Sequence, residues 1–359
     1  MKVQPSRRLS GENPTPRVSV VVPCYNYGHY LEGCVESIVS QPGVETDVLI
    51  IDDASPDGSG EVADALADGY SMVRSVRHAT NRGHISTYNE GLEAVDSDYV
   101  VLLSADDLLA PGALARAASL MEHNPTVGLV YGNPQTFEST PPTASRTSSW
   151  WSVWEGADWV EAQFKRAMSI VYSPEAVVRT SVHHEAGYYR HDLPHSGDLE
   201  LWLRIAAIAD VGRVNGPDQA YRRVHPNSMM QTQYASVLTD LAKRDDAYES
   251  FLARSGYDAD TADELRMTVR RVLSSEALGW AITVLDDLPG SADSVDAAVR
   301  FAQQMDPDFE SLRVWRELSV RRSVAEGHRG RLPASAAFDA GIRDLAGRVR
   351  WRRWRYFGV

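Results

Sequence analysis

Short apolar runs alternate with amphipathic stretches through the first 131 residues of the chain. The β-branched run Val18–Val22 is typical of a strand that is buried on both faces of a sheet. The next stretch, His29–Ser40, places Leu31, Val35 and Ile38 on one side of a helix. Alternating strands and helices of this kind predict an α/β fold with a mostly parallel sheet and flanking helices.

The pattern continues beyond these two elements. Further strands are predicted at Val48–Ile51, Met72–Val76, Tyr99–Leu103 and Val127–Tyr131, and further helices at Ile85–Val95 and residues 111–123. After about residue 235 the strand pattern ends, and apolar residues recur at helical spacing. We therefore expect a flexible lead-in over residues 1–16, an α/β domain over 17–234 and a mostly helical C-terminal region over 235–359.

Composition narrows the class of protein. The net charge of −13 argues against a general nucleic-acid binder, because such a protein needs a basic face for phosphates. The two cysteines, Cys24 and Cys34, form no metal-binding pattern and fit a reducing compartment. No apolar run approaches the roughly 20 residues that cross a bilayer, and the N-terminal residues lack the apolar core of a secretory signal. A cytoplasmic protein is therefore expected.

The C-terminal residues are basic in an otherwise acidic chain, and Arg and Trp alternate from Val349 to Phe357. Such a tail fits peripheral contact with a membrane surface. It fits equally well docking onto an acidic partner, or packing on the acidic surface of this protein itself. The helical region that precedes the tail could serve assembly into a homo-oligomer.

Polar residues follow three of the expected strands. They are Pro23-Cys24-Tyr25-Asn26 after the first strand, Asp52-Asp53 after the second, and Ser104-Ala105-Asp106-Asp107 after the strand Tyr99–Leu103. Ligands of open parallel sheets bind outside the carboxyl ends of the strands. We therefore expect these groups to gather at one edge of the sheet.

A dinucleotide-binding domain is one alternative, since it also carries an acid after its second strand. That fold needs glycines after its first strand so that the backbone can approach a pyrophosphate, whereas residues 23–28 contain one glycine and two tyrosines. A flat aromatic ring can stack on a base, and a carboxylate can accept the imide N–H of uracil or thymine. The sequence favours a pyrimidine nucleotide over NAD.

Asp106 and Asp107 repel each other at the end of a buried strand unless a cation lies beside them. Their hard oxygen ligands, together with a substrate diphosphate, suit Mg²⁺ or Mn²⁺. Such an ion would neutralise the charge that develops on a leaving nucleotide diphosphate. The alternative is a turn in which an acid caps the helix that begins near Pro111.

Four ordered motifs resemble those of the family 2 glycosyltransferases, which have the GT-A fold. They are Val18-Ser19-Val20-Val21-Val22-Pro23-Cys24-Tyr25-Asn26, Ile51-Asp52-Asp53-Ala54-Ser55-Pro56-Asp57-Gly58, Asn81-Arg82-Gly83 with Asn89-Glu90-Gly91, and Ser104-Ala105-Asp106-Asp107. The resemblance extends over roughly residues 17–230. It implies a nucleotide-sugar half over residues 17–131 and an acceptor half over residues 132–234.

The resemblance also implies roles for single residues. Pro23 and Tyr25 would line the nucleoside, and Asp53 would contact the base. Asp106 would face the ribose or diphosphate, and Asp107 would hold the metal ion. The other residues that it places in the nucleotide-sugar site are Asn26, Gly83 and Asn89.

The chain departs from the family pattern at two positions. Ser104 stands where the first acid of the usual D-x-D motif would be. Tyr88 replaces an arginine that often precedes the family asparagine, which leaves the diphosphate with one cation fewer. Arg82 could compensate for that loss.

The segment Ser196-Gly197-Asp198-Leu199-Glu200-Leu201-Trp202 resembles the family's E-D-x-x-L-W stretch. It places Asp198 at the general base that deprotonates the acceptor hydroxyl, and Gly197 at the glutamate that precedes this base. A helix dipole would lower the pKa of an aspartate at a helix start, so a useful base depends on burial. A simple N-cap is the alternative role.

The segment Tyr221–Ser228 resembles the Y-R-x-H-like stretch that follows in many members. The resemblance makes His225 a ligand of the metal ion or a contact of the diphosphate, and Arg223 a partner of phosphate charge. A structural role is the alternative for His225. The Q-x-x-R-W pattern of processive synthases is missing, so we expect transfer of a single sugar. Two roles are open for a cluster of four tryptophans: they form an aromatic platform that binds the acceptor, or they pack in the core. These residues are Trp150, Trp151, Trp154 and Trp159.

The chain is therefore expected to be a metal-dependent inverting glycosyltransferase that uses a UDP- or dTDP-sugar. A hexosyl or N-acetylhexosaminyl unit would pass to a hydroxyl of a small glycoside, a natural product, or a glycan- or lipid-linked acceptor. Two alternatives are a non-catalytic GT-A module that binds nucleotide or scaffolds a complex, and a nucleotidyltransferase. The latter would need a Gly-rich, basic loop after the first strand, which Cys24–Tyr27 does not supply.

Overall fold

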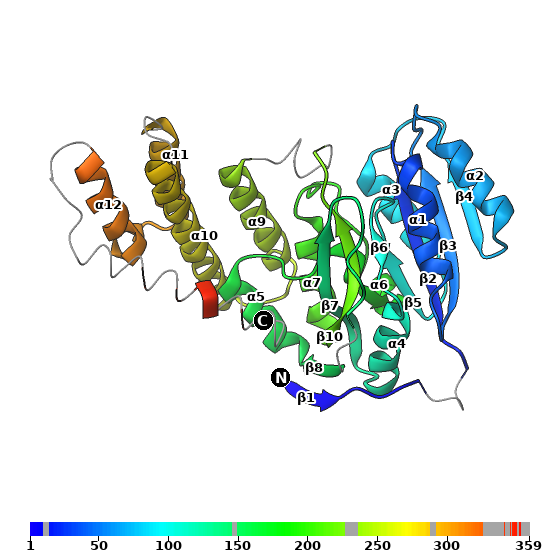
Figure 1. Ribbon diagram of the computed structural model, residues 1–359. Coiled ribbons are helices and arrows are strands. Elements are labelled where there is room, and N and C mark those ends of the chain that lie inside the picture. The colour runs from blue at the N-terminus through cyan, green and yellow to red at the C-terminus, as the bar shows by residue number, and fades with distance from the viewer. Residues whose placement is uncertain are drawn as a thin grey trace. The chain divides into compact units, whose positions relative to one another are not determined.

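The computed structural model describes residues 1–9, 14–145, 149–226, 236–287 and 292–325, and beyond these only residues 341, 345, 347–349 and 352 (Figure 1). The expected domain boundary at residue 234 and most of the Arg/Trp tail lie outside the described residues. The chain divides into two compact units. The first comprises Met1–Val160 and Ser169–Ser228, and the second comprises Glu161–Met168 and the helices after residue 236.

The first unit is built on one mixed sheet in the order β1-β8-β10-β7-β9-β5-β2-β3-β4, with β6 paired to β10. Its strands are β1 (Lys2–Pro5), β2 (Arg17–Cys24), β3 (Glu45–Asp52), β4 (Val73–Arg77), β5 (Tyr99–Leu102), β6 (Leu108–Leu109), β7 (Val127–Phe137), β8 (Trp150–Trp154), β9 (Val177–Arg179) and β10 (Asp210–Arg223). The strands β4, β3, β2 and β5 run parallel, as the alternating pattern predicts. The short β9 is antiparallel to both β5 and β7, and it joins this parallel part to β7 and β10.

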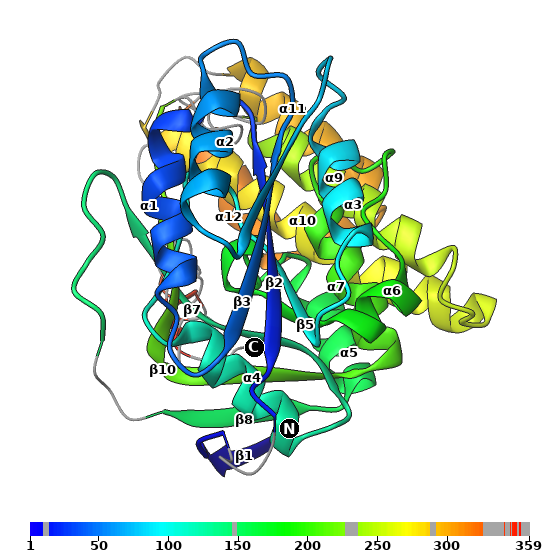
Figure 2. The ribbon, with the colours of Figure 1, turned by 90° about the vertical axis from the view of Figure 1, so that its right-hand side faces the viewer.

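Helices cover both faces of the sheet, which confirms the α/β class. The helices of this unit are α1 (Gly28–Val39), α2 (Ser59–Gly69), α3 (His84–Glu93), α4 (Ala113–His123), α6 (Thr180–Ala186) and α7 (Gly197–Ile208), with a 3-10 turn at Ser173–Glu175. Helix α5 (Gly156–Arg166) begins in this unit and ends in the second. Helices α1 and α2 pack on one face of β2 and β3, and α3 packs on the other (Figure 2). Val20, Val21 and Val22 of β2 are fully buried because the strand is covered on both sides.

The N-terminal residues differ from the expected flexible lead-in. Lys2–Pro5 form the edge strand β1, which pairs antiparallel with β8 in a register that sets Val3 opposite Ser152. The Oγ of Ser6 also donates to the carbonyl oxygen of Ser149 at 2.7 Å. Sequence patterning misses this strand because its stretch is short and polar and pairs with residues about 150 positions away.

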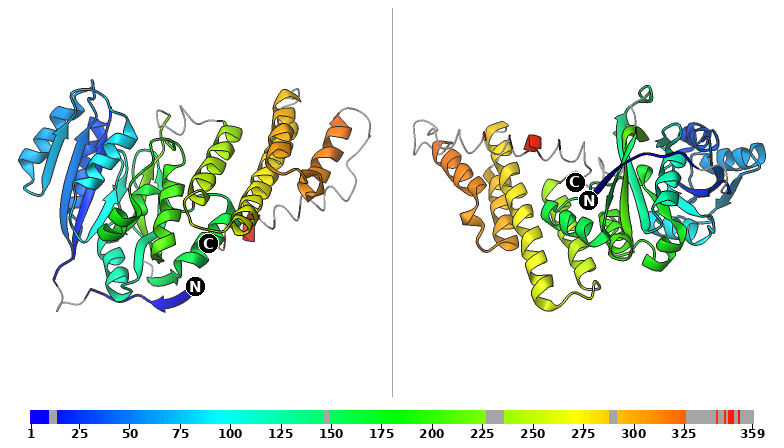
Figure 3. Two further views of the ribbon diagram at one scale, coloured as in Figure 1. Left: turned by 180° about the vertical axis from the view of Figure 1, so that it is seen from behind. Right: turned by 90° about the horizontal axis from the view of Figure 1, so that it is seen from below.

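The second unit is helical, as the apolar spacing predicts. It contains α9 (Val237–Leu252), α10 (Ala259–Asp287), α11 (Ala292–Met305) and α12 (Arg313–Ala325), with a 3-10 turn at Phe309–Ser311. Helix α10 lies beside α11 and α12 (Figure 3). Their shared core includes Leu278, Ile282, Val295, Ala298 and Leu318. Within the described part of the chain, no helix is both long and apolar enough to span a membrane.

Gly91 in the family-like Asn89-Glu90-Gly91 motif marks the closest approach of α3 to the sheet. A Cβ at this position would lie 2.3 Å from Cγ1 of Val21 and 3.1 Å from Cδ1 of Ile51. We expect Gly91→Ala to lower the free energy of unfolding by about 1–3 kcal/mol through overpacking, although alanine favours a helix intrinsically. Urea unfolding of the purified protein measures this change.

The matched control is Gly69→Ala near the exposed end of α2, where a Cβ would meet no atom of the described residues within 4 Å. Its stability should stay the same or rise slightly. Equal stabilities of the two variants would contradict the proposed close packing of α3.

Candidate active site

The carboxyl ends of β2, β3 and β5 meet at one edge of the sheet, as predicted. Parallel pairing sets Cys24 opposite Asp52, and Val21 opposite Leu102. The chain then turns at Asn26, whose φ of 61° lies in the left-handed region and whose N–H donates to Oγ of Ser55 at 3.0 Å. These turns bring the motif residues of all three strand ends together.

Pro23 and Tyr25 lie at the first of these strand ends. Pro23 is partly buried, whereas Tyr25 is 46% exposed. So large an exposed aromatic side chain beside a row of buried strand ends is a surface on which a planar base can stack.

Asp53 is buried, and its carboxylate accepts three hydrogen bonds from the segment that follows β4. Oδ1 accepts from the N–H of Arg82 at 2.7 Å and lies 2.7 Å from Nδ1 of His78, and Oδ2 accepts from the N–H of Gly83 at 2.9 Å. Burial alone would raise its pKa, but these hydrogen bonds bring the pKa below its usual value. Asp53 thus fixes the Asn81-Arg82-Gly83 turn, with Gly83 at a φ of 82°.

Asp52 is the residue that sequence reasoning did not single out. Its side chain is buried at the last position of β3, and Oδ2 accepts the N–H of Ser55 at 3.3 Å. Its buried Oδ1 accepts no hydrogen bond from any described residue. A buried acceptor without a partner is costly, so Asp52 carries an unsatisfied acceptor at this strand end. Its position as the last strand residue was the available signal.

Asp106 and Asp107 are both buried after β5. Oδ2 of Asp106 lies 3.1 Å from Nε2 of His225, and Oδ1 of Asp107 accepts the N–H of Arg223 at 2.8 Å. Burial, followed by the negative charge of Asp106, raises the pKa of Asp107 to about 8. Neither acid caps α4, whose N-cap is Gly112, so the helix-cap alternative does not hold.

Arg223 anchors this corner of the site. Its Nε donates to the carbonyl oxygen of Asp106 at 3.0 Å, and its Nη1 donates to that of Glu138 at 3.0 Å. The guanidinium lies 4.3 Å and 4.4 Å from the ring centroids of Tyr30 and Phe137. This arginine, expected to neutralise phosphate, is therefore engaged with carbonyl groups and aromatic rings. Its neighbour Arg222 stacks on the ring of Tyr172 at 5.2 Å, and its charge lowers the pKa of Asp107 against the larger effects of burial and Asp106.

Asp106, Asp107 and His225 are the candidate ligands of a divalent cation. Within the described residues, no group of three or more His, Cys, Asp and Glu side chains is arranged so that it could hold a metal ion by itself. Two buried neighbouring carboxylates with an imidazole beside them nevertheless form a donor set of the kind that Mg²⁺ or Mn²⁺ takes when substrate oxygens and water complete the coordination. Burial and the charge of Asp106 raise the pKa of Asp107, so a cation beside the pair would favour its ionised form.

Asp198 lies in the first turn of α7 and is partly buried. The hydroxyl of Tyr189 donates to its Oδ1 at 2.7 Å. Burial raises the pKa of Asp198, and the hydrogen bond from Tyr189 and the charge of His84 oppose that rise. The N-cap of α7 is Ser196, so Asp198 does not cap the helix. Burial thus raises the pKa of Asp198, which a general base at a helix start requires.

Tyr88 and Asn89 on α3 connect the two groups of acids. Burial raises the pKa of Tyr88, and the charges of Asp198, Asp106 and Asp107 add to this, so its hydroxyl lies within electrostatic reach of both groups. Asn89 bonds to the backbone of Tyr189 through both ends of its amide, at 2.8 and 2.9 Å. Its amide is therefore engaged with protein, and so is Arg82, whose guanidinium pairs with Glu90.

Several other candidates are structural. Trp151, Trp154 and Trp159 are buried in the core, which supports packing over an acceptor platform for these three tryptophans. Glu200 is buried and bonds to Nε of Arg204 through both carboxylate oxygens at 2.9 Å.

Residues 19–184 match the family model described as Glycosyl transferase family 2. They form a family 2 glycosyltransferase domain. The uncharacterized glycosyltransferase YibD of Escherichia coli is 27% identical over 195 residues, which are 50% of this chain and 55% of that protein. The uncharacterized protein MT1568 of Mycobacterium tuberculosis is 28% identical over 216 residues, 54% of this chain and 63% of that protein. The chain thus matches little more than half the length of these relatives.

Solved structures show that the fold is that of GT-A glycosyltransferases. TarS residues 1–349 from S. aureus, solved with UDP-GlcNAc, gives a TM-score of 0.61 at 17% identity and covers 86% of this chain and 87% of that chain. The mannosyltransferase PcManGT from Pyrobaculum calidifontis, solved with GDP-Man and Mn²⁺, gives a TM-score of 0.55 at 17% identity. The match covers 99% of this chain and 87% of that chain.

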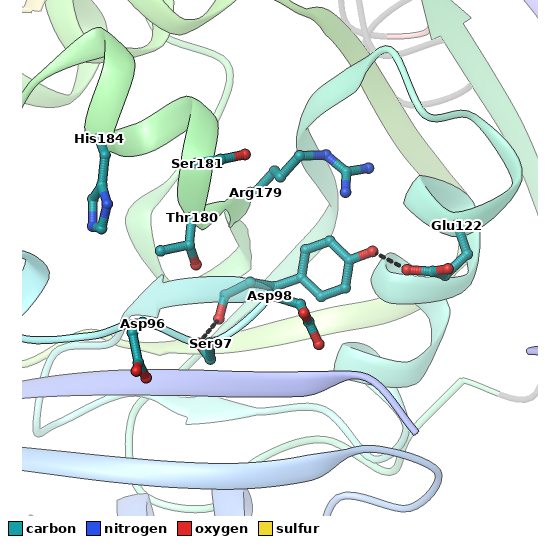
Figure 4. Close-up of a pocket in the computed structure, with 9 residues that line it drawn as sticks. Asp96, Ser97, Asp98, Glu122, Arg179, Thr180, Ser181 and His184 are labelled. Atoms are coloured by element: carbon teal, nitrogen blue, oxygen red, sulfur yellow. Dashed lines mark hydrogen bonds between the residues drawn. The ribbon is translucent and has the colours of Figure 1, made fainter. Parts of the chain in front are cut away.

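A cavity of about 410 Å³ lies at the other end of β5 of the family 2 domain, away from the acid pair (Figure 4). Most of the charged groups that line it are engaged with protein. Asp98 accepts the N–H of Arg17 at 2.9 Å, Tyr99 bonds to Glu122, and Arg179 donates to backbone carbonyl groups. These bonds hold β9 and α4 against β5, so the cavity has a structural explanation.

The raised pKa of Asp107 predicts that, without a bound cation, the free energy of unfolding of the domain depends on pH. The unfolded chain ionises this carboxyl near pH 4, whereas the folded protein holds its proton to about pH 8. Stability is therefore lost as the pH rises through this window. Asp107→Asn should raise the free energy of unfolding at pH 8 by about 1 kcal/mol or more, with a much smaller effect near pH 4. Urea unfolding in EDTA measures both values.

Mn²⁺ should stabilise the unsubstituted protein and have little effect on Asp107→Asn. A variant that is less stable than the unsubstituted protein at pH 8 in EDTA would show that the buried carboxylate is already compensated by the protein.

Proposed function

We propose that the chain is a metal-dependent inverting glycosyltransferase that moves a single sugar from a UDP- or dTDP-sugar to an acceptor hydroxyl. The observation that carries this proposal is the joint placement of a buried acid pair and the partly buried Asp198 around Tyr88, at the carboxyl edge of a GT-A sheet. TarS, solved with UDP-GlcNAc, supports the donor assignment, and PcManGT, solved with GDP-Man and Mn²⁺, supports a nucleotide-sugar donor and the metal ion but not the pyrimidine base.

The donor half of the site would work as follows. Tyr25 stacks on the base, and Asp53, which also shapes the adjoining turn, contacts the base. Asp106, Asp107 and His225 hold Mg²⁺ or Mn²⁺, which offsets the charge on the leaving diphosphate. Arg222 adds positive charge beside Asp107, in the role that the missing family arginine leaves open.

Asp198 would take the proton of the acceptor hydroxyl as the new glycosidic bond forms. Its pKa is raised by burial, which makes it a stronger base than a solvated aspartate. The acceptor would be a small glycoside, a natural product, or a glycan- or lipid-linked precursor. In this proposal residues 17–234 carry catalysis, and the helical region with its Arg/Trp tail serves assembly or peripheral membrane contact in the cytoplasm.

A thermal-shift screen of UDP-, dTDP- and GDP-sugars, each with and without Mn²⁺, tests the donor assignment. We expect UDP- or dTDP-sugars to raise the melting temperature only when Mn²⁺ is present, because a ligand at 100 times its Kd stabilises by about 2.7 kcal/mol. Asp107→Ala should lose this response, whereas Asp96→Ala, whose acid is 92% exposed, should keep it. A response to GDP-sugars alone would overturn the pyrimidine assignment.

Asp198→Asn keeps the size of the side chain and removes the base. We expect kcat for transfer to fall by about 10²–10⁴-fold, with the donor-induced thermal shift unchanged. Asp192→Asn is the control, because that acid is 65% exposed and lies in the same segment. Transfer at the unsubstituted rate by Asp198→Asn would remove Asp198 from the mechanism.

A further inference from the structure

Tyr189 is buried in the loop between α6 and α7 and touches the acid that the proposed function makes the base. It is 5% exposed, and its hydroxyl donates to Oδ1 of Asp198 at 2.7 Å. A hydrogen bond to a carboxylate is stronger than one between neutral groups. The bond therefore fixes one of the two oxygens of Asp198 and leaves Oδ2 for the acceptor proton.

The backbone of Tyr189 is held in place from α3. Nδ2 of Asn89 donates to the carbonyl oxygen of Tyr189 at 2.8 Å, and the N–H of Tyr189 donates to Oδ1 of Asn89 at 2.9 Å. Two bonds from one amide set the position and the orientation of this peptide. The ring edge of Tyr189 also packs against Tyr88, with 5.5 Å between the ring centroids. The hydroxyl is therefore aimed at Asp198 by contacts that do not involve Asp198.

Gly197 gives the ring the room that it needs. A Cβ at residue 197 would lie 3.1 Å from Cδ1 of Tyr189, which is tighter than most contacts of real Cβ atoms. Residue 197 is where the family resemblance expects a glutamate. In this chain the space beside the base is thus filled by a neutral hydrogen-bond donor.

We propose that Tyr189 is a positioning residue for the general base, and that Gly197 is the adaptation that admits its ring. The proposal rests on the proposed function. Tyr189 orients Asp198 and keeps it ionised. A glutamate at residue 197 would instead favour protonation of Asp198, because two neighbouring carboxylates repel each other.

Two groups favour the charged form of Asp198 in this arrangement, namely Tyr189 and His84. Burial raises the pKa of Asp198, while the Tyr189 hydrogen bond and the charge of His84 lower it. Loss of the Tyr189 hydroxyl removes one of the two opposing effects. The base would then stay protonated to a higher pH.

Tyr189→Phe tests the proposal, with Tyr188→Phe as the matched control that removes a hydroxyl from the adjacent, partly exposed residue. We expect the acid limb of the kcat profile between pH 5 and pH 9 to move to higher pH in Tyr189→Phe. At pH 6.5 kcat should fall about tenfold or more, since a hydrogen bond to a charged group contributes about 1.5–3 kcal/mol. The KM for the donor should stay the same, and Tyr188→Phe should match the unsubstituted protein.

A second measurement does not depend on turnover. The carboxyl ¹³C shift of labelled aspartate, assigned with Asp198→Asn, should titrate at a higher pH in Tyr189→Phe. Gly197→Ala, which presses on the ring, should shift the same limb in the same direction by a smaller amount. If both the kinetic limb and the carboxyl titration stay in place in Tyr189→Phe, the inference is wrong. Absence of transfer by the unsubstituted protein with every donor would instead overturn the proposed function.

Discussion

Burying Asp106 and Asp107 side by side at the end of β5 costs free energy, and the surrounding structure offsets that cost only in part. The backbone N–H of Arg223 bonds to one acid and the imidazole of His225 lies beside the other, yet the pKa of Asp107 remains raised to about 8. The guanidinium of Arg223 is turned away into carbonyl groups and rings. Hydrogen bonds thus hold both acids in place, while the pKa of Asp107 shows that its negative charge is not fully compensated.

Much of this arrangement can be predicted from the sequence. Strands that are covered on both faces need continuous apolar runs, so β2, β3 and β5 can be recognised from Val18–Val22, Val48–Ile51 and Tyr99–Leu103. The turn residues that follow parallel strands must meet at one edge of the sheet. The order of strands and turns alone therefore predicts that Asp53 and Asp106 lie at the same edge, beyond the carboxyl ends of the strands. The family 2 assignment rests on the same motifs, and the match over residues 19–184 confirms it.

The remainder depends on contacts between distant parts of the chain. No local pattern shows that both ends of the Asn89 amide bond to a peptide 100 positions away, or that three donors occupy Asp53 and leave Asp52 with an unsatisfied acceptor. The antiparallel β9 is short, and its place between β5 and β7 is set by pairing rather than by its own sequence. Motifs therefore identify the residues of the site, and only the fold decides which of them face a ligand and which hold the others.

The two hydrogen bonds between Asn89 and the backbone of Tyr189 have an evolutionary consequence. They involve only the main chain at residue 189, so they do not depend on the side chain there. A mutation at this position can therefore replace the group that touches Asp198 while the loop keeps its course. Paired exchanges at 189 and 197 would let descendants of this domain adjust the acidity of Asp198 in small steps, without changing the strand ends that carry Asp53 and Asp106.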